Sequence, residues 1–404
     1  MVGIANDLNI NQLGIQSFNN VNGVFTGVTI TAGTGITVTN GNGQTGNPII
    51  SSSGDLHTSP FIVSPGGAAN GANYTTIGAA YAAAVAQGGK QTIFVQPGTY
   101  TENITLTPGV NITAFGSDGS LNATGNVIIS GKATLTGAGS VTISGIQLQT
   151  NSDFFLAVTG SVASVVNLNS CYLNCSNHTG ISHTSSSPSS VINISSCNGN
   201  LGTTGIGLFT STSGGNIFIN GSYISNTGAS TTSSTVSTGV ITCNYNKFNI
   251  SFSTSSVGVF GFNNCSLDNS ANNSTVLTTA GTGSAVVTNC YCASGSASAI
   301  SVGTGTTLNI SASSISSTNT NAITGVGSIT YYGIAFSGPS QVINTTTQTG
   351  GVLQGGTVQA PSAGFIGERI SSVIVSTGVS VSTNTPTNIT NISLTAGIWD
   401  VSLI

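Results

Sequence analysis

The stretch that decides the fold is VNLNSC at residues 166–171, because related short stretches recur along the chain. INISSC follows at 192–197, FGFNNC at 260–265 and LNISAS at 308–313, and further copies end at residues 145, 222 and 290. Most steps from one copy to the next are 23 to 26 residues. A repeat of 20–50 residues is typical of a solenoid, a propeller or another repeat array.

Each repeat unit contains several short stretches of alternating apolar and polar residues and no helical pattern, which indicates short strands. The unit is too short for a propeller blade of roughly 40–45 residues, and it lacks the Leu and Asn pattern of leucine-rich repeats. About two dozen residues match one coil of a parallel β-helix. We therefore predict an all-β solenoid over residues 58–338, with aliphatic side chains stacked inside and Ser, Thr and Asn outside.

The segments on either side of the repeats differ from them. Residues 1–57 contain short alternating pieces at 28–31 and 36–39 between Gly and Asn, which predicts an N-terminal β stem or attachment segment. At 74–87 Ile77, Tyr81 and Val85 lie on one helical face, and a Gly pair follows, so we expect one helix there, covering the first coil. Residues 339–404 are predicted to form a C-terminal β segment.

The seven cysteines are odd in number and lie at nearly the repeat spacing, which argues against a disulfide framework. Four of them occupy one repeat position that two serines also occupy, and Cys243 lies near the position expected for the remaining unit. We interpret this position as a ladder of small buried side chains, formed by Cys171, Cys197, Ser222, Cys243, Cys265, Cys290 and Ser313. The alternative is metal binding by Cys290 with Cys292 or by Cys171 with Cys175, but neither pair has the spacing of a zinc site. We expect no metal site, and assembly in a reducing cytoplasm.

Charged residues are scarce: four Lys or Arg and eight Asp or Glu among 404 residues, about 3% against roughly 25% in an average domain. With four basic residues and a net charge of −4, the chain cannot neutralise a run of phosphates, which excludes nucleic acid as a partner. No apolar stretch approaches the roughly 18 residues of a membrane helix, and the N-terminus has no signal-peptide pattern. We expect no membrane insertion.

Catalysis of glycoside cleavage needs two carboxyl groups at roughly 5–9.5 Å. The predicted solenoid contains Glu102, Asp118, Asp153 and Asp268, and their successive spacings of 16, 35 and 115 residues match no small number of coils. His178 and His183 lie in a Ser-rich stretch and are interpreted as turn residues. We therefore expect no catalytic residues, no cofactor and no enzyme activity, with a polysaccharide depolymerase as the alternative.

The region around the expected helix resembles the opening of pectin lyase-like right-handed β-helix domains. The resemblance rests on FIVSP at 61–65, YTTIGAA at 74–80 and IFVQPGTYTENI at 93–104. It implies a right-handed coil whose first turn is capped by a helix.

Residues 28–43 and 47–50 resemble stem segments of phage and prophage tail-fibre proteins, and residues 361–368 with 392–401 resemble a β domain at the ends of such fibres. That domain usually continues beyond a Trp-Asp pair such as Trp399-Asp400, so we expect an incomplete fibre-tip domain, either shortened or completed by neighbouring chains. The resemblance implies a tail fibre or tailspike: a homotrimer on a virion or extracellular surface that attaches to a host-surface polysaccharide by multivalent binding.

Scattered aromatic residues are the candidates for stacking against sugars: Tyr172, Tyr223, Phe248, Tyr291, Tyr331 and Tyr332. A second interpretation is a subunit that polymerises into an extracellular or virion-surface filament or coat, since low charge and exposed strands favour contacts between copies. Strand exchange between chain ends is the feature that would distinguish it.

Overall fold

The computed structural model describes residues 20–21, 24–25, 36–39, 49–52, 61–67, 73–115, 126–150, 153–175, 178–202, 207–212, 214–226, 233–319, 321–337, 342–345, 347–350, 353–354 and 357–358. The chain divides into two compact units, residues 1–60 and 61–404. In the first unit, β1 (Asn20–Val21) pairs antiparallel with β2 (Val24–Phe25), and β3 (Ile36–Thr39) with β4 (Ile49–Ser52). The strand expected at 28–31 lies outside the described residues.

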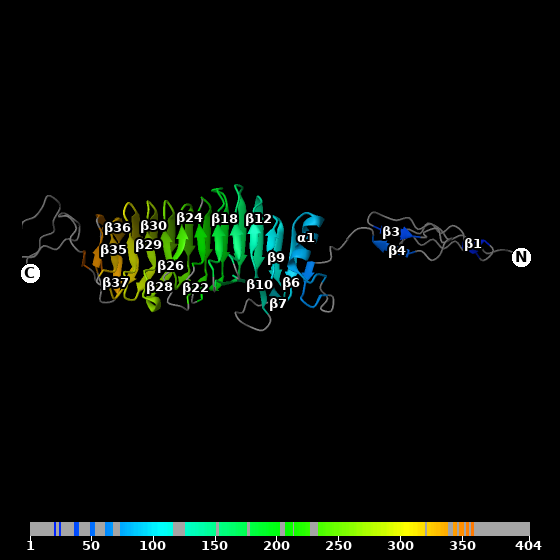
Figure 1. Cartoon of the computed structure of the whole chain (residues 1–404), viewed down its shortest axis with the longest axis horizontal. Coiled ribbons are helices and arrows are strands. Elements are labelled where there is room, and N and C mark those ends of the chain that lie inside the picture. Colours follow the sequence, from blue (N-terminus) through cyan, green and yellow to red (C-terminus); the bar gives the residue numbers. More distant parts are fainter. Residues whose placement is uncertain are drawn as a thin grey trace, which may run out of the picture. The chain divides into compact units, whose positions relative to one another are not determined.

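The second unit is a right-handed parallel β-helix, which confirms the predicted all-β fold (Figure 1). Its strands form three parallel sheets of 12, 12 and 13 strands, here named sheets 1, 2 and 3. Each coil of the chain contributes one strand to each sheet in turn, and each strand pairs with its equivalents in the coils before and after it.

Sheet 1 contains β7 (Gly98–Tyr100), β10 (Val127–Ser130), β13 (Gln147–Gln149), β16 (Tyr172–Asn174), β19 (Asn198–Asn200), β22 (Tyr223–Ser225), β25 (Lys247–Phe248), β28 (Ser266–Asn269), β31 (Tyr291–Ser294), β34 (Ser314–Ser316), β37 (Ile334–Ser337) and β40 (Leu353–Gln354). Sheet 2 contains β8 (Ile104–Leu106), β11 (Ala133–Leu135), β14 (Leu156–Val158), β17 (Ile181–His183), β20 (Phe209–Ser211), β23 (Ser233–Val236), β26 (Ser251–Thr254), β29 (Leu277–Thr279), β32 (Ile300–Val302), β35 (Ile323–Gly325), β38 (Val342–Asn344) and β41 (Thr357–Val358). Sheet 3 contains β5 (Phe61–Val63), β6 (Gln91–Val95), β9 (Val110–Ala114), β12 (Gly139–Ser144), β15 (Ser164–Asn169), β18 (Val191–Ser195), β21 (Asn216–Asn220), β24 (Val240–Asn244), β27 (Val259–Asn263), β30 (Ser284–Thr288), β33 (Thr307–Ser311), β36 (Ser328–Tyr332) and β39 (Thr347–Gly350).

The sheets extend past residue 338, where the sequence analysis placed the start of a separate C-terminal segment. Strands β38 to β41 continue all three sheets as far as Val358. A short 3₁₀ turn, η2 (Ser270–Asn272), follows β28. Residues 359–404, which include the candidate fibre-tip domain, lie outside the described part of the chain.

Helix α1 (Ile77–Gln87) covers the first coil, as predicted, but it begins three residues later than expected. Thr76 caps its N-terminus by accepting a hydrogen bond from Ala79 N at 3.2 Å. The buried face is formed by Ile77, Ala80, Tyr81 and Ala84, whereas Val85, expected on that face, is 42% exposed. Within the described residues no helix is long and apolar enough to cross a membrane.

Tyr81 fastens the helix to the solenoid. Its hydroxyl lies 3.1 Å from the carbonyl oxygens of Thr107 and Val110, and it accepts a hydrogen bond from Thr107 N at 2.8 Å. Burial raises the pKa of Tyr81 to about 12, so the hydroxyl stays protonated and able to donate.

A sharp corner joins each strand of sheet 3 to the next strand of sheet 1. In nine successive coils the corner residue has a left-handed backbone, with φ between 46° and 68°: Gly145, Ser170, Ser196, Gly221, Tyr245, Asn264, Asn289, Ala312 and Gly333. Residues other than Gly and Asn rarely adopt a left-handed backbone, so the packing of neighbouring coils must hold these corners in place.

The residue after each corner points inward, and its buried backbone N–H needs an acceptor. In five coils that acceptor is the side chain at the same position of the next coil. Cys171 N donates to Cys197 Sγ at 3.4 Å, Cys197 N to Ser222 Oγ at 3.1 Å, and Ser222 N to Asn246 Oδ1 at 2.8 Å. The series resumes with Cys265 N to Cys290 Sγ at 3.3 Å and Cys290 N to Ser313 Oγ at 3.1 Å. The ladder is therefore a chain of hydrogen bonds and not only a column of small side chains.

The predicted position of Cys243 in this ladder was wrong. Cys243 lies inside β24, where it pairs with Ile219 and Phe262 and faces the core. The ladder position of this coil belongs to Asn246, which is 3% exposed. Its amide accepts from Ser222 N and donates to Ile219 O at 2.7 Å, so it satisfies two backbone groups at once.

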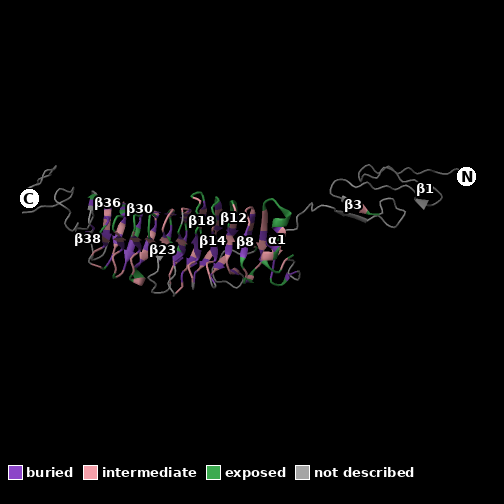
Figure 2. Ribbon diagram, turned by 45° about the horizontal axis from the view of Figure 1, so that its top comes forward, coloured by how far each residue is buried: buried purple, intermediate pink, exposed green. Residues whose placement is uncertain are grey.

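The core runs without interruption through the coils, and buried residues line their inside (Figure 2). Its widest side chains gather in the middle of the solenoid, where Phe248 lies edge-on to Phe252 at 5.0 Å and Phe260 stacks on Phe262 at 5.5 Å between ring centroids. Aromatic pairs at such distances add to the stabilisation from burial.

His183 was interpreted as a turn residue, and this is wrong: it ends β17 and is fully buried. Its Nε2 lies 3.1 Å from Ser190 Oγ, while Nδ1 has no hydrogen-bond partner among the described residues. Burial lowers the pKa of His183 to about 4, because an imidazolium in this place would lose its hydration.

We predict that Asn246→Ala lowers the free energy of unfolding by about 2–4 kcal/mol, because it leaves the buried Ser222 N–H and Ile219 carbonyl without a partner. Urea denaturation followed by circular dichroism measures the change. Asn309→Ala is the matched control: Asn309 is exposed on β33, and we expect a change within about 0.5 kcal/mol. Equal effects of the two variants would contradict the role of the ladder.

A second prediction concerns acid. The folded state holds the pKa of His183 below its unfolded value of 6.5, so stability is fully present above pH 6.5 and falls as the pH drops towards 4. The loss reaches about 3 kcal/mol at the lower limit. Melting temperatures of the wild type and of His183→Leu, measured from pH 7.5 to 4, should diverge, with the variant falling less. Parallel curves would show that His183 does not titrate in this window.

Candidate functional site

One outward-facing column of sheet 1 collects three of the predicted sugar-stacking residues. The strand register aligns Tyr172 with Asn198, Tyr223, Lys247, Ser266 and Tyr291 in successive coils. We name these six residues the outer column. Strands in a sheet lie about 4.8 Å apart, so Tyr172 and Tyr223 are separated by about 10 Å, and Tyr223 and Tyr291 by about 14 Å.

The side chains of the outer column are accessible. Tyr223 is 41% exposed and Tyr291 39%, while Tyr172 is half-buried, which raises its pKa. The Lys247 ammonium lies 5.4 Å from the centroid of the Tyr223 ring, within the range of a cation–π contact. The column therefore offers apolar ring faces, an amide, a hydroxyl and one cation on a rigid sheet.

An open groove accompanies the outer column along the corner between sheets 3 and 1. Its walls include Asn198, Tyr223, Lys247 and Tyr291 from the column, and Tyr245 from the corner itself. Tyr245 is 71% exposed, and the sequence analysis missed it. It occupies the left-handed corner position that Ser, Gly and Asn hold in neighbouring coils, so aligning the repeats on that position points to it.

The other three predicted residues do not belong to this surface. Phe248 and Tyr331 were wrong, since both are buried in the core. Successive residues of a strand face opposite sides of the sheet. Lys247 therefore points outward and Phe248 inward. In the same way, Tyr331 points inward and Tyr332 outward. Tyr332 is 67% exposed, but it ends β36 of sheet 3 and is not part of the outer column.

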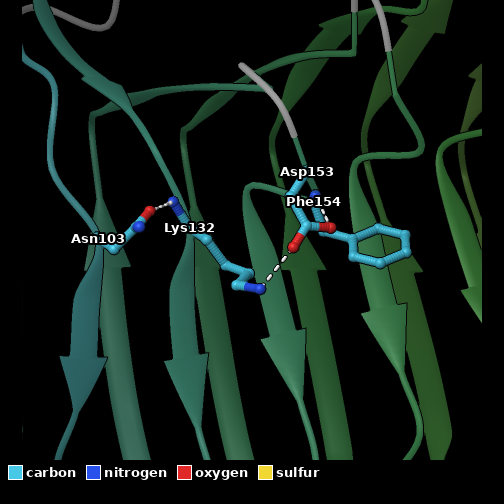
Figure 3. A network of polar contacts seen from close by, with 4 residues as sticks. All are labelled: Asn103, Lys132, Asp153 and Phe154. Atoms are coloured by element: carbon cyan, nitrogen blue, oxygen red, sulfur yellow. Dashed lines mark hydrogen bonds and ion pairs between the residues drawn. The ribbon is translucent and has the colours of Figure 1, made fainter.

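A second groove lies where sheet 1 turns into sheet 2, near the helix. It is lined by residues of three successive coils, among them Glu102, Lys132 and Asp153. Figure 3 shows the Lys132 side chain reaching to the neighbouring coil, where its Nζ lies 2.5 Å from Asp153 Oδ2. Lys132 N donates to Asn103 Oδ1 at 2.8 Å, and the Phe154 N–H donates to Asp153. The Lys132 ammonium holds the pKa of the Asp153 carboxyl below its usual range.

Glu102 has a structural partner in this groove. Its two carboxylate oxygens accept hydrogen bonds from Ile77 N at 2.8 Å and Gly78 N at 2.7 Å, the first two N–H groups of α1. A carboxylate at a helix N-terminus satisfies unpaired donors and complements the helix dipole. Glu102 therefore fixes the capping helix to the first coils.

The spacings between successive acids in the sequence match no small number of coils, so no carboxyl pair was predicted. Glu102 and Asp153 are 51 residues apart, which is two coils, and the structure brings them to one groove on either side of Lys132. Asp268 lies on β28 of sheet 1, several coils beyond Asp153. Asp118 lies outside the described residues.

The cysteines have no arrangement for metal binding in the part of the chain that is described, where no three His, Cys, Asp or Glu side chains gather. All seven are free and buried. Burial raises the pKa of the Cys243 thiol, and that of Cys292 to about 12, so these thiols stay protonated near neutral pH.

Comparison with known proteins adds two solved structures. No protein-family model and no curated protein matches the chain. The structure is similar to the A-module of the mannuronan C-5 epimerase AlgE6 of Azotobacter vinelandii, with 12% identity, a TM-score of 0.43, and coverage of 71% of this chain and 95% of that one. The A-module of AlgE4 from the same organism gives 11% identity and a TM-score of 0.31, over 70% and 92% of the two chains.

These neighbours overturn the expectation that the chain is not an enzyme, because modules of epimerases have a similar β-helix fold. At 11–12% identity the likeness concerns the fold alone and assigns no reaction or substrate to this chain.

We predict that Glu102→Ala lowers the free energy of unfolding by about 1–3 kcal/mol, since it leaves two N–H groups of α1 without their charged acceptor. Asp153→Asn is the matched control in the same groove. Its ion pair with Lys132 is solvent-exposed, and such pairs contribute about 0–1 kcal/mol. Thermal unfolding of both variants measures the difference, and a smaller loss for Glu102→Ala than for Asp153→Asn would contradict the capping role.

Proposed function

We propose that this protein binds a surface polysaccharide along the outer column. The observation that supports the proposal best is the strand register, which aligns Tyr172, Tyr223 and Tyr291 on one face of a continuous sheet. Sugar rings carry apolar C–H faces that pack on aromatic rings, and their hydroxyls bond to amide and hydroxyl side chains such as Asn198 and Ser266. A row of rings at coil spacing suits an extended chain of sugars.

In the same proposal the protein is an attachment fibre of a phage-like particle, a homotrimer on the virion surface. The support for this part is the sequence resemblance to segments of tail fibres, at residues 28–43, 47–50, 361–368 and 392–401. Three copies of a shallow site raise the overall affinity without a strong contact in any one copy. A shallow, open groove is the kind of site that benefits from this effect.

A second candidate is a self-assembling filament or coat subunit. It is favoured by sheets 2 and 3, whose described strands contain no Asp, Glu, Lys or Arg. Such faces lack charge repulsion between copies. Electron microscopy of the purified protein separates the candidates. A closed attachment fibre has one length, whereas an open polymer has a broad range of lengths.

We predict that Tyr223→Ala weakens binding to a polysaccharide by about tenfold, as expected when an aromatic contact of a binding surface is truncated. An array of bacterial surface polysaccharides identifies a ligand, and titration calorimetry measures the affinity.

The matched control is Phe115→Ala, which removes an aromatic ring that is 49% exposed, packs edge-on to Phe94 of sheet 3, and is not part of the outer column. It should bind like the wild type. If truncating Tyr223 and Tyr291 leaves binding to the identified polysaccharide unchanged, the outer column is not the site. The same incubations, assayed for new reducing ends, report whether the bound polysaccharide is cleaved.

A further inference from the structure

Lys247 is the one cation in the described strands of the solenoid, and it lies within the outer column. Its neighbours in the column are Tyr223 in the coil before it and Ser266 in the coil after it. No carboxylate of the described residues lies within 4.0 Å of the Lys247 ammonium. The ion pair among the described residues joins Lys132 and Asp153 instead. The ammonium is thus in contact with an aromatic ring and has no acidic partner among the residues that the structure describes.

The nearest acid in the strand register is Asp268, which lies on β28 two residues beyond Ser266 and also faces outward. Its Oδ1 accepts hydrogen bonds from Ser270 N at 3.0 Å and from Ser270 Oγ at 2.6 Å. These bonds direct the carboxylate to its own turn. Asp268 therefore contributes negative charge to the face without pairing with Lys247.

An ammonium has three donors, and the ring of Tyr223 interacts with the cation without accepting all of them. Hydrogen bonds in which both partners are charged are shorter and stronger than neutral ones. A sugar stacked on Tyr223 places its substituents next to Lys247, so an anionic substituent gains a charge-assisted bond that a hydroxyl does not.

We infer that the outer column selects an anionic polysaccharide, in which a carboxylate or sulfate on a sugar bonds to Lys247 between the rings of Tyr223 and Tyr291. The inference rests on the proposed function and specifies the class of its ligand. Asp268 sets a limit on selectivity, because it repels the same anion from one rung away.

Three polymers with one backbone test it: dextran, carboxymethyl dextran and dextran sulfate, each immobilised and titrated with the full-length protein. At 50 mM salt we expect the wild type to bind the two anionic polymers about tenfold more tightly than dextran, and at 500 mM salt the difference should shrink because the charges are screened. The two anionic polymers distinguish a carboxylate from a sulfate ligand.

Variants assign the effect to the column. Lys247→Gln should bind the anionic polymers no better than dextran, whereas Lys90→Gln, which removes an exposed cation outside sheet 1, should retain the wild-type preference. Asp268→Asn should tighten binding of the anionic polymers by about twofold, since it removes a repulsion. Circular dichroism checks that each variant is folded.

Equal binding of neutral and anionic dextrans, or a preference that survives Lys247→Gln, overturns the inference. The proposed function fails by a different result, namely unchanged binding of the identified polysaccharide when Tyr223 and Tyr291 are truncated. If the wild type and Lys247→Gln prefer the anionic polymers equally, the surface as a whole attracts them. That result also overturns the inference.

Discussion

The structure depends on how each coil satisfies the buried N–H that follows its left-handed corner. The corner forces the backbone to turn inward within one residue, which leaves a donor inside the solenoid where water cannot reach it. The side chain at the same position of the next coil accepts it, through Cys, Ser or Asn. Each coil therefore needs its neighbour in one register, and a slip by one residue would remove the acceptor and turn every core side chain outward.

The candidate site depends on the same register. Tyr172, Tyr223 and Tyr291 are far apart in sequence, and only the repeated corner brings them to one column at multiples of the strand spacing. The groove beside them follows the corners, and Tyr245 is exposed because it occupies one. The ladder inside and the outer column outside thus both follow from the same repeated corner.

Much of the fold could be predicted from the sequence, because a solenoid repeats its side-chain pattern at a nearly fixed interval. The ladder positions of Cys171, Cys197, Ser222, Cys265, Cys290 and Ser313 follow from that interval. Cys243 did not, because the coil between Asn246 and Cys265 is short and the ladder residue there is an amide instead of a thiol. Residue type was a poorer guide than position relative to the corner.

The site was harder to predict, for physical reasons that particular residues illustrate. Lys247 and Phe248, like Tyr331 and Tyr332, are adjacent and face opposite sides, so aromatic identity alone cannot separate surface from core. Glu102 and Asp153 line one groove because two full coils separate them in sequence, with Lys132 on the coil between.

The direction of the ladder has an evolutionary consequence. Cys197, Ser222 and Cys290 each accept from the coil before and donate their own N–H to the coil after, so a coil of this kind can be duplicated and still bond to both neighbours. Such events would move Tyr291 relative to Tyr223 in increments of about 4.8 Å while leaving both rings on the same face. The spacing of the rings along the outer column can therefore change with the number of coils, with no substitution at either tyrosine.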